Sequence, residues 1–458
     1  MIHNDPKKWC FSQISRLRQC SLVGILLQFF VVWVAYPVCT VWGQEDLPTD
    51  LSGFESNDLF GVEDDVPLDA DDDFLTRLIY RAGTVSKKAM RDEADASKEV
   101  ENSALKAAPQ DYRFWVFHRS AVVTRMARHQ LPEDVATPEF KNYWLLHVKI
   151  GGETCLVISK QVPPTWGKLK EMNEPIQFYG FFFGLKSQES FLQQPESVPV
   201  FVCDRVSWYP NKASTDIVES HLLLARQGVD LASLDALRSA HGRRLSEAES
   251  EFFYQFLRAA KAVDESPDLL DSVETIEFFD LFRSWKKSTG RVVEIDGIVS
   301  RALPVVIDAD RQAELGTEQV YELDLYVPLD RTIKVRDVEY DSRFPVTVQV
   351  LSLPMSPEEM KGKRIRVKGF FYRFWNYQSV YTQEAGTGGQ MAPLVIGFNP
   401  REVKVSTGQI DFLLTVAAIV FVVGAVAMMW FLRRGDKNES NVLQKKKEAM
   451  PEQIDIKL

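Results

Sequence analysis

The 458-residue chain has few of the residues on which metal binding and covalent catalysis usually depend. It contains only 6 histidines, and none of them lies at a spacing suited to a metal site. It also has no Gly-x-Ser-x-Gly sequence, no glycine-rich phosphate loop and no Cys-x-x-Cys pair. The sequence therefore predicts no metal and no cofactor, and no motif identifies a catalytic residue.

Cysteine is also scarce. There are 5 cysteines, and Cys10, Cys20 and Cys39 lie close to the N-terminus. Only Cys155 and Cys203 remain in the rest of the chain, at a spacing that fits no zinc site. In a compartment that permits disulfides these two could form a bridge, or they could be separate buried thiols. The sequence leaves both alternatives open.

The excess of acidic over basic residues is concentrated in one segment. The net charge is −10, but residues 44–76 contain 12 Asp or Glu residues and no Lys or Arg. Residues 44–73 are therefore predicted to be an acidic, disordered linker. In the chain as a whole, the 45% hydrophobic and 11% aromatic content is enough for two or three domains with real cores.

Two apolar segments stand near the ends of the chain. The first, Leu22–Trp42, follows several basic residues, which predicts a signal peptide or signal anchor over residues 1–43. The second, Phe412–Leu432, carries no charge and precedes Arg433 and Arg434, which predicts a transmembrane helix over 411–432 and a cytoplasmic tail over 433–458. The lipid bilayer is then a partner through Phe412–Leu432. Residues 44–410 are expected outside the cytoplasm, on the periplasmic side of the cell membrane.

A short pattern occurs twice. Ile176-x-Phe178-x-Gly180 is followed by three aromatic residues, and so is Ile365-x-Val367-x-Gly369. Such a recurrence indicates one β-rich module used twice. The flanking sequences extend the repeat, because each copy has five strand-like runs in the same order. The predicted organisation is a helical segment over 74–110, a first module over 111–212, a helical insert over 213–289 and a second module over 290–404.

In each copy a short helical segment separates the third and fourth runs, most clearly from Pro357 to Gly362. Five strands with a small helix at this place resemble the OB-fold, a Greek-key barrel. The predicted class is α+β, with two five-stranded OB-like barrels separated by helices and one C-terminal transmembrane helix. The resemblance implies that Gly180 and Gly369 allow a bend in the fourth strand. It also makes the third and fifth strands neighbours, so a bridge between Cys155 and Cys203 stays open.

Cations and aromatic rings alternate in the fourth run of the second module. Such a surface suits an anionic ligand, and OB-folds commonly bind through one. An ordinary amphipathic strand would show the same alternation. Nucleic acid is disfavoured, because the expected location is extracytoplasmic and the first copy has Gln177 and Tyr179 at two of the outward positions. The candidate ligand-binding residues are Arg364, Arg366, Lys368, Tyr372, Arg373 and Trp375.

These features favour a membrane-anchored binding or scaffold protein whose partners are other envelope proteins or an anionic ligand. The chain resembles the broad class of bacterial envelope proteins that display small barrels beside a membrane helix, without matching a named family. The alternative is an enzyme or an envelope assembly factor with its site in the cleft between the two modules.

Overall fold

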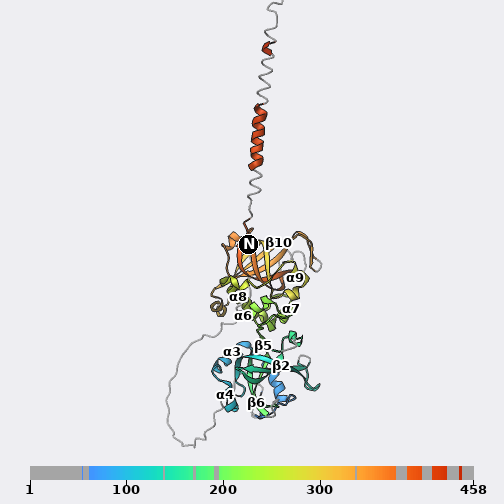
Figure 1. Cartoon of the computed structure of the whole chain (residues 1–458), viewed down its shortest axis with the longest axis vertical. Helices are drawn as coiled ribbons and strands as arrows, with labels where there is room; N and C mark the ends of the chain where they lie inside the picture. Colours follow the sequence, from blue (N-terminus) through green and yellow to red (C-terminus); the bar gives the residue numbers. More distant parts are fainter. Residues whose placement is uncertain are drawn as a thin grey trace, which may run out of the picture. The chain divides into compact units, whose positions relative to one another are not determined.

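The computed structural model describes residue 54 and residues 61–137, 140–168, 172–189, 195–335, 338–377, 389–404, 415–430 and 443–445 (Figure 1). The chain divides into two units, Met1–Thr49 and Asp50–Leu458, and all described residues belong to the second. The predicted signal peptide or anchor over 1–43 lies outside the described residues. So does the predicted cytoplasmic tail over 433–458, apart from residues 443–445.

Five strands form the first barrel. Their pairings run from β2 to β3, β4, β6, β5 and back to β2, so the ring is closed. The β4–β6 pair is parallel and the other four pairs are antiparallel. A short helix, η1 (Pro164–Lys168), separates the third and fourth strands. The strands are β2 (Val116–Gln130), β3 (Asn142–Ile150), β4 (Glu153–Gln161), β5 (Glu174–Glu189) and β6 (Pro195–Arg205).

The second barrel repeats this topology. Its pairings run from β9 to β10, β13, β15, β14 and back to β9, and only the β13–β15 pair is parallel. Helix α12 (Pro357–Met360) occupies the place of η1, and Ser356 and Glu359 form a capping box at its start. Both barrels therefore have the strand order of an OB-fold, as the sequence predicts. The strands are β9 (Val292–Val306), β10 (Gln319–Pro328), β13 (Arg343–Val350), β14 (Arg364–Tyr377) and β15 (Gln390–Glu402).

The repeated glycines lie where the fourth strand approaches the fifth. Gly369 is opposite Gly397 in the β14–β15 pair. A Cβ atom at Gly369 would lie 2.6 Å from the carbonyl oxygen of Ile396 and 2.8 Å from the Cα of Gly397, closer than any carbon can pack. At Gly180 the corresponding contact, with the carbonyl oxygen of Val202, is 3.0 Å. Glycine is required here by the close approach of two backbones, in addition to any bend.

The helices before the first barrel cover its outer surface. In α2 (Asp73–Ala82) the residues Leu75, Leu78 and Ile79 are buried at helical spacing against outward side chains of β4, β5 and β6. The side chain of Asp72 accepts a hydrogen bond from the Phe74 amide and begins the helix. Three more helices follow: α3 (Lys87–Ala96), α4 (Asn102–Ala107) and α5 (Pro109–Tyr112).

Residues 61–73, predicted as part of a disordered linker, are bound to the first barrel instead. Val62 is buried, and β1 (Val66–Pro67) pairs with β5 in parallel. The Asp64 carboxylate pairs with Arg113 and accepts a hydrogen bond from the Leu185 amide at 2.8 Å. The acidic composition is misleading here because specific donors on the barrel satisfy the charge.

The helical insert shares its core with both barrels. Side chains from the interior of the first barrel, the insert and the outer face of β14 and β15 belong to one cluster of buried residues. In the longest helix of the insert, α8, the Phe256 ring lies 6.1 Å from that of Phe370 and 5.3 Å from that of Tyr372. The helices of the insert are α6 (Glu219–Arg226), η2 (Leu231–Ser233), α7 (Leu234–Ser239), η3 (Glu247–Glu249), α8 (Ser250–Glu265), η4 (Pro267–Leu270), α9 (Asp280–Arg283) and α10 (Trp285–Ser288).

Smaller elements complete the described fold. Helix α11 (Ala309–Leu315) connects β9 to β10. The remaining strands are short: β7 (Ser207–Trp208) pairs with β5, β8 (Thr275–Ile276) with β9, and β11 (Ile333–Val335) with β12 (Val338–Tyr340).

Residues 415–430 form a helix. Within the described part of the chain, no helix has the combination of length and hydropathy that a membrane span requires. The outer residues of the predicted span, including Phe412 and Leu432, lie outside the described residues.

The two cysteines of the first barrel are free and buried, so the suggested bridge is not formed. In the parallel β4–β6 pair Cys203 is opposite Ser159, four residues along β4 from Cys155. Four residues of strand span about 13 Å, whereas disulfide-linked Cα atoms are about 4.4–6.8 Å apart. The third and fifth strands are neighbours as expected, but their register keeps the two thiols apart. Burial raises the pKa of both thiols to about 12.

Candidate ligand-binding groove

The outward arginines predicted to bind a ligand on β14 are paired with carboxylates of the adjacent strand β9. Arg364 donates to Asp296 at 2.6 Å, and Arg366 donates to the same carboxylate at 2.9 Å. Arg366 also lies 3.6 Å from Glu294, the residue opposite the half-buried Lys368. Burial alone would raise the pKa of Asp296, but the two arginines lower it. The positive charge of this face is therefore largely neutralised within the barrel.

The other three predicted residues are buried. Trp375 is stacked on Tyr377, and Tyr372 is enclosed by aromatic rings of α8. Arg373 is 0% exposed and holds the chain segment before α8, since it donates to both oxygens of Glu249 at 2.9 and 3.1 Å. Tyr372, Arg373 and Trp375 are thus structural residues, and they are not accessible to a ligand.

A groove of about 950 Å³ lies elsewhere, between the first barrel and the helical insert. The outward side chains of β2 and β5 form its floor, the β3–β4 turn closes one end, and the end of α6 with one residue of α8 forms the opposite wall. The lining residues are Ser120, Ala121, Val122, Thr124, Lys149, Gly151, Gly152, Asn173, Pro175, Ile176, Gln177, Tyr209, Ala225, Arg226, Gln227, Gly228 and Arg258.

The charges along the groove have one sign. Lys149, Arg226 and Arg258 line it, and none of the described lining residues is Asp or Glu. Arg226 is 3.7 Å from Glu219, but its side chain remains 58% exposed, so this pair holds it only weakly. Arg226 and Arg258 each have a carboxylate neighbour outside the lining, Glu219 and Glu314. The lining itself carries three cations and no carboxylate among its described residues, which makes the groove attractive to a negatively charged group.

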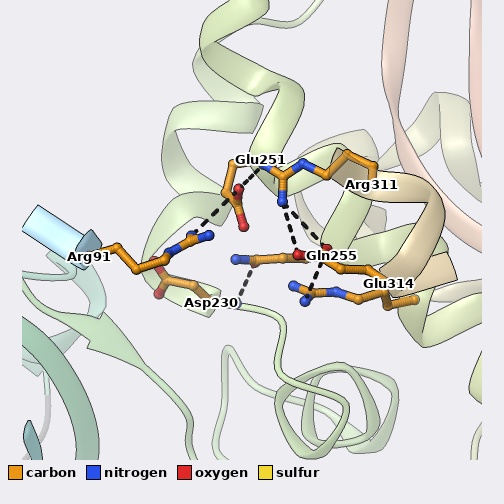
Figure 2. A network of polar contacts seen from close by, with 7 residues as sticks. Arg91, Asp230, Glu251, Gln255, Arg311 and Glu314 are labelled. Carbon is orange, nitrogen blue, oxygen red and sulfur yellow. Dashed lines mark hydrogen bonds and ion pairs between the residues drawn. The ribbon is translucent and has the colours of Figure 1, made fainter. Parts of the chain in front are cut away.

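A polar network fixes the wall that α8 contributes (Figure 2). Arg258 is 3.5 Å from Glu314 of α11, and Arg311 of α11 pairs with Glu251 at the start of α8. Arg91 of α3 is 3.9 Å from the same Glu251 carboxylate. Burial alone would raise the pKa of Glu251, but the hydrogen bond and charge of Arg311 lower it. The network therefore joins α8 to the helices before the first barrel and to the second barrel.

Aromatic rings continue the floor. The ring of Tyr209 is half-buried in the lining, and burial raises its pKa to about 12. Next to the groove, the rings of His118 and Tyr179 are stacked with their centroids 4.4 Å apart and their planes at 11°. These two residues are opposite each other in the β2–β5 pair. Each lies two residues along its strand from the neighbouring opposed pair, Ser120 and Gln177. The groove therefore offers cations and amides, and the stacked rings of His118 and Tyr179 adjoin it.

Sequence reasoning did not find this groove because its parts come from six separate regions of the chain. The one local signal was the alternation of buried Ala121 and Val123 with the accessible Ser120, Val122 and Thr124. That alternation identifies an outward strand face, but not the helices that wall it.

A metal site is not seen in the part of the chain that the structure describes, where no group of three or more His, Cys, Asp or Glu side chains is placed to hold an ion. The buried His221 links α6 to Thr289, the residue that follows α10, instead. Its Nε2 lies 2.9 Å from the Thr289 carbonyl oxygen, and burial lowers its pKa to about 4.

No protein-family model and no curated protein matches the chain. Among solved structures, a small single-stranded DNA-binding protein from Streptomyces coelicolor is 10% identical with a TM-score of 0.16, over 24% of this chain and 93% of that one. The Plasmodium falciparum SSB in complex with ssDNA is also 10% identical, with a TM-score of 0.16, over 25% and 94%. The N-terminal domain of an archaeal MCM is 14% identical, with a TM-score of 0.18, over 40% and 97%. At such TM-scores the likeness carries no argument, and the OB assignment rests on the strand pairing.

The comparisons correct one prediction made from the sequence. Nucleic acid was disfavoured as a partner, but the structures that match include single-stranded DNA-binding proteins, so the comparisons give no support to that exclusion. Gln177 and Tyr179, whose presence at outward positions counted against nucleic acid, line and adjoin the groove. The exclusion is therefore withdrawn.

Proposed function

We propose that the protein is a membrane-held binding scaffold whose groove beside the first barrel takes an extended polyanion, polynucleotides included. The observation that carries this proposal is the lining of the groove, which includes Lys149, Arg226 and Arg258 and no carboxylate among its described residues. A volume of about 950 Å³ is at the upper end of the range for ligand sites, and the groove is open along β2.

The shared core supports a scaffold role. One cluster of buried residues includes the first barrel, the insert and the outer face of the second barrel. The wall of the groove is therefore fixed before a ligand arrives, which reduces the ordering that binding requires.

Membrane attachment is the second part of the proposal. The helix over 415–430 is apolar on all sides and exposed throughout, with Ile419 58%, Phe421 78% and Val423 61% exposed. A helix that is apolar all round suits a hydrocarbon environment. Arg433 and Arg434 follow it, and by the positive-inside rule they favour an extracytoplasmic location for the barrels.

Binding is tested with the full chain in detergent micelles, using a labelled dT20 oligonucleotide, heparin and inorganic polyphosphate in fluorescence anisotropy and competition assays. Ser120→Trp fills the floor of the groove, and Gln130→Trp, an exposed residue at the end of β2, is the matched control. The proposal expects at least one of the three polymers to bind the wild type and the control, and to bind Ser120→Trp at least tenfold more weakly. Equal binding by both variants, or no binding by the wild type, would contradict it.

The membrane part is tested by carbonate extraction of membranes from expressing cells. The double change Phe421→Arg and Val423→Arg places two charges in the proposed span, each disfavouring insertion by about 2.5–3.5 kcal/mol. We expect this variant in the soluble fraction, whereas Val306→Arg, a change at an equally exposed apolar residue of β9, should leave the protein in the pellet. Retention of the double variant in the pellet would refute this helix as the sole membrane attachment.

A further inference from the structure

We infer that the polyanion is a single-stranded nucleic acid, whose phosphates follow the basic side of the groove and one of whose bases stacks on the His118–Tyr179 pair. This inference rests on the proposed function, since it names the ligand class of the same groove. Three properties of the groove favour this class over other polyanions: a prestacked ring pair, its alignment with the groove floor and the kinds of polar group in the lining.

The ring pair is already arranged for stacking. His118 is exposed and Tyr179 is half-buried, and their nearly parallel rings lie 4.4 Å apart. The Gln177 side chain hydrogen-bonds to His118 and so restricts the imidazole. Every nucleic acid base has a π-face, and stacking on an aromatic side chain is the main sequence-tolerant contact of single-stranded binding proteins. A pair fixed in advance loses little side-chain freedom when a base joins it.

The rings lie in line with the groove. Along β2, His118 is two residues from Ser120, which is about 7 Å, and both point outward. Tyr179 stands in the same relation to Gln177 on β5. A chain lying along these strands therefore passes from the basic lining over the ring pair without changing direction.

The polar groups of the lining match phosphodiesters and bases. Phosphodiester oxygens only accept hydrogen bonds, and the charged groups here, Lys149, Arg226 and Arg258, only donate. The amides of Asn173, Gln177 and Gln227 both donate and accept, as the edges of bases do. Sugar hydroxyls also donate hydrogen bonds, and carboxylates are the best acceptors for them. No carboxylate is among the described lining residues. The lining therefore favours a polynucleotide over a glycan.

The test compares labelled dT20 with polyphosphate and heparin on the full chain in detergent micelles. The double variant His118→Ala/Tyr179→Ala removes the ring pair, Tyr179→Phe retains a ring, and Tyr80→Ala, an exposed tyrosine on α2, is the control. Loss of stacking with one base should weaken dT20 binding about 5- to 150-fold in the double variant. Polyphosphate binding should be unchanged in this variant, and Tyr179→Phe and Tyr80→Ala should bind dT20 like the wild type.

Each of the other possible results would refute the inference, and one of them would also refute the proposed function. If the wild type binds polyphosphate or heparin but not dT20, or if the double variant retains the dT20 affinity, nucleic acid stacking is refuted while the proposed function stands. If the double variant loses dT20 and polyphosphate equally, the rings hold the groove together and do not bind a base, and the inference fails. If the wild type binds none of the three polymers, the proposed function itself fails.

Discussion

The sharpest prediction concerns Arg373, which the sequence presents as a ligand-binding residue and the structure places in the core. We consider the change Arg373→Met, which keeps the length of the side chain and removes its charge. The guanidinium is 0% exposed and donates to both oxygens of Glu249 and to the carbonyl oxygens of Arg243, Arg244 and Phe374.

The free-energy cost of Arg373→Met depends on the group that loses its partner, the Glu249 carboxylate. The Glu249 side chain is only 16% exposed, so the substitution strands a largely buried carboxylate. Removal of one partner of a buried ion pair costs about 3–5 kcal/mol. If the segment before α8 opens to resolvate Glu249, its opening equilibrium increases by roughly 160- to 4,700-fold, at 1.36 kcal/mol for each factor of ten.

Native-state hydrogen exchange resolved by NMR or by fragmentation measures this opening directly. The reporters are the amide of Gly242, which donates to the Phe374 carbonyl at 3.0 Å, and the amide of Asn376, which donates to the Arg243 carbonyl at 3.1 Å. Both should exchange at least 100-fold faster in Arg373→Met. The double variant Arg373→Met/Glu249→Leu, which removes the stranded charge, should recover much of the protection.

The reasoning is refuted if both amides of Arg373→Met exchange at the wild-type rate, or if the double variant opens more than the single one. A reduced affinity for dT20 with unchanged exchange would point to direct ligand contact by Arg373 instead.

Three further predictions follow from the core. The pKa of His221 is about 4 in the fold against 6.5 in the unfolded chain, so stability should fall by about 3 kcal/mol as the pH decreases from 6.5 to 4; urea titrations should show this loss in the wild type and not in His221→Gln. Gly369→Ala should lower the free energy of unfolding by at least 1–3 kcal/mol, and Gly180→Ala by less, because only the former forces a Cβ within 2.6 Å of a backbone oxygen; equal urea midpoints for the two variants would contradict the contact argument. Cys155 and Cys203 should react slowly with iodoacetamide in the native protein and completely after unfolding without reductant; a disulfide-linked peptide containing both would overturn the register assigned to β4 and β6.

The barrels were predictable because their signals are local. The alternation in runs such as Ile365-x-Val367, the Pro357 helix and the order of five runs are properties of consecutive residues, and the strand pairing reproduces them. The register of the β4–β6 pair could not be predicted to within one residue. Cys203 is opposite Ser159, which is four residues from Cys155 on β4.

The site was not predictable for a different reason. Whether Arg373 is a surface cation or a core residue depends on the segment that ends at Glu249, more than 100 residues away in sequence. In the same way, Arg258 faces the groove because α6, α8 and the β2–β5 face meet in space. An outward strand position indicates accessibility only when no later part of the chain covers it.

The shared core has a consequence for the history and handling of the chain. Two copies of one module that began as separable units would each have needed a water-compatible outer face, yet β14 and β15 now present Phe370, Tyr372, Leu394 and Ile396 to the insert. The second barrel expressed alone would expose this apolar surface and would be expected to aggregate. The repeat can still be recognised in the sequence, but the second barrel now depends on the insert to cover its apolar face.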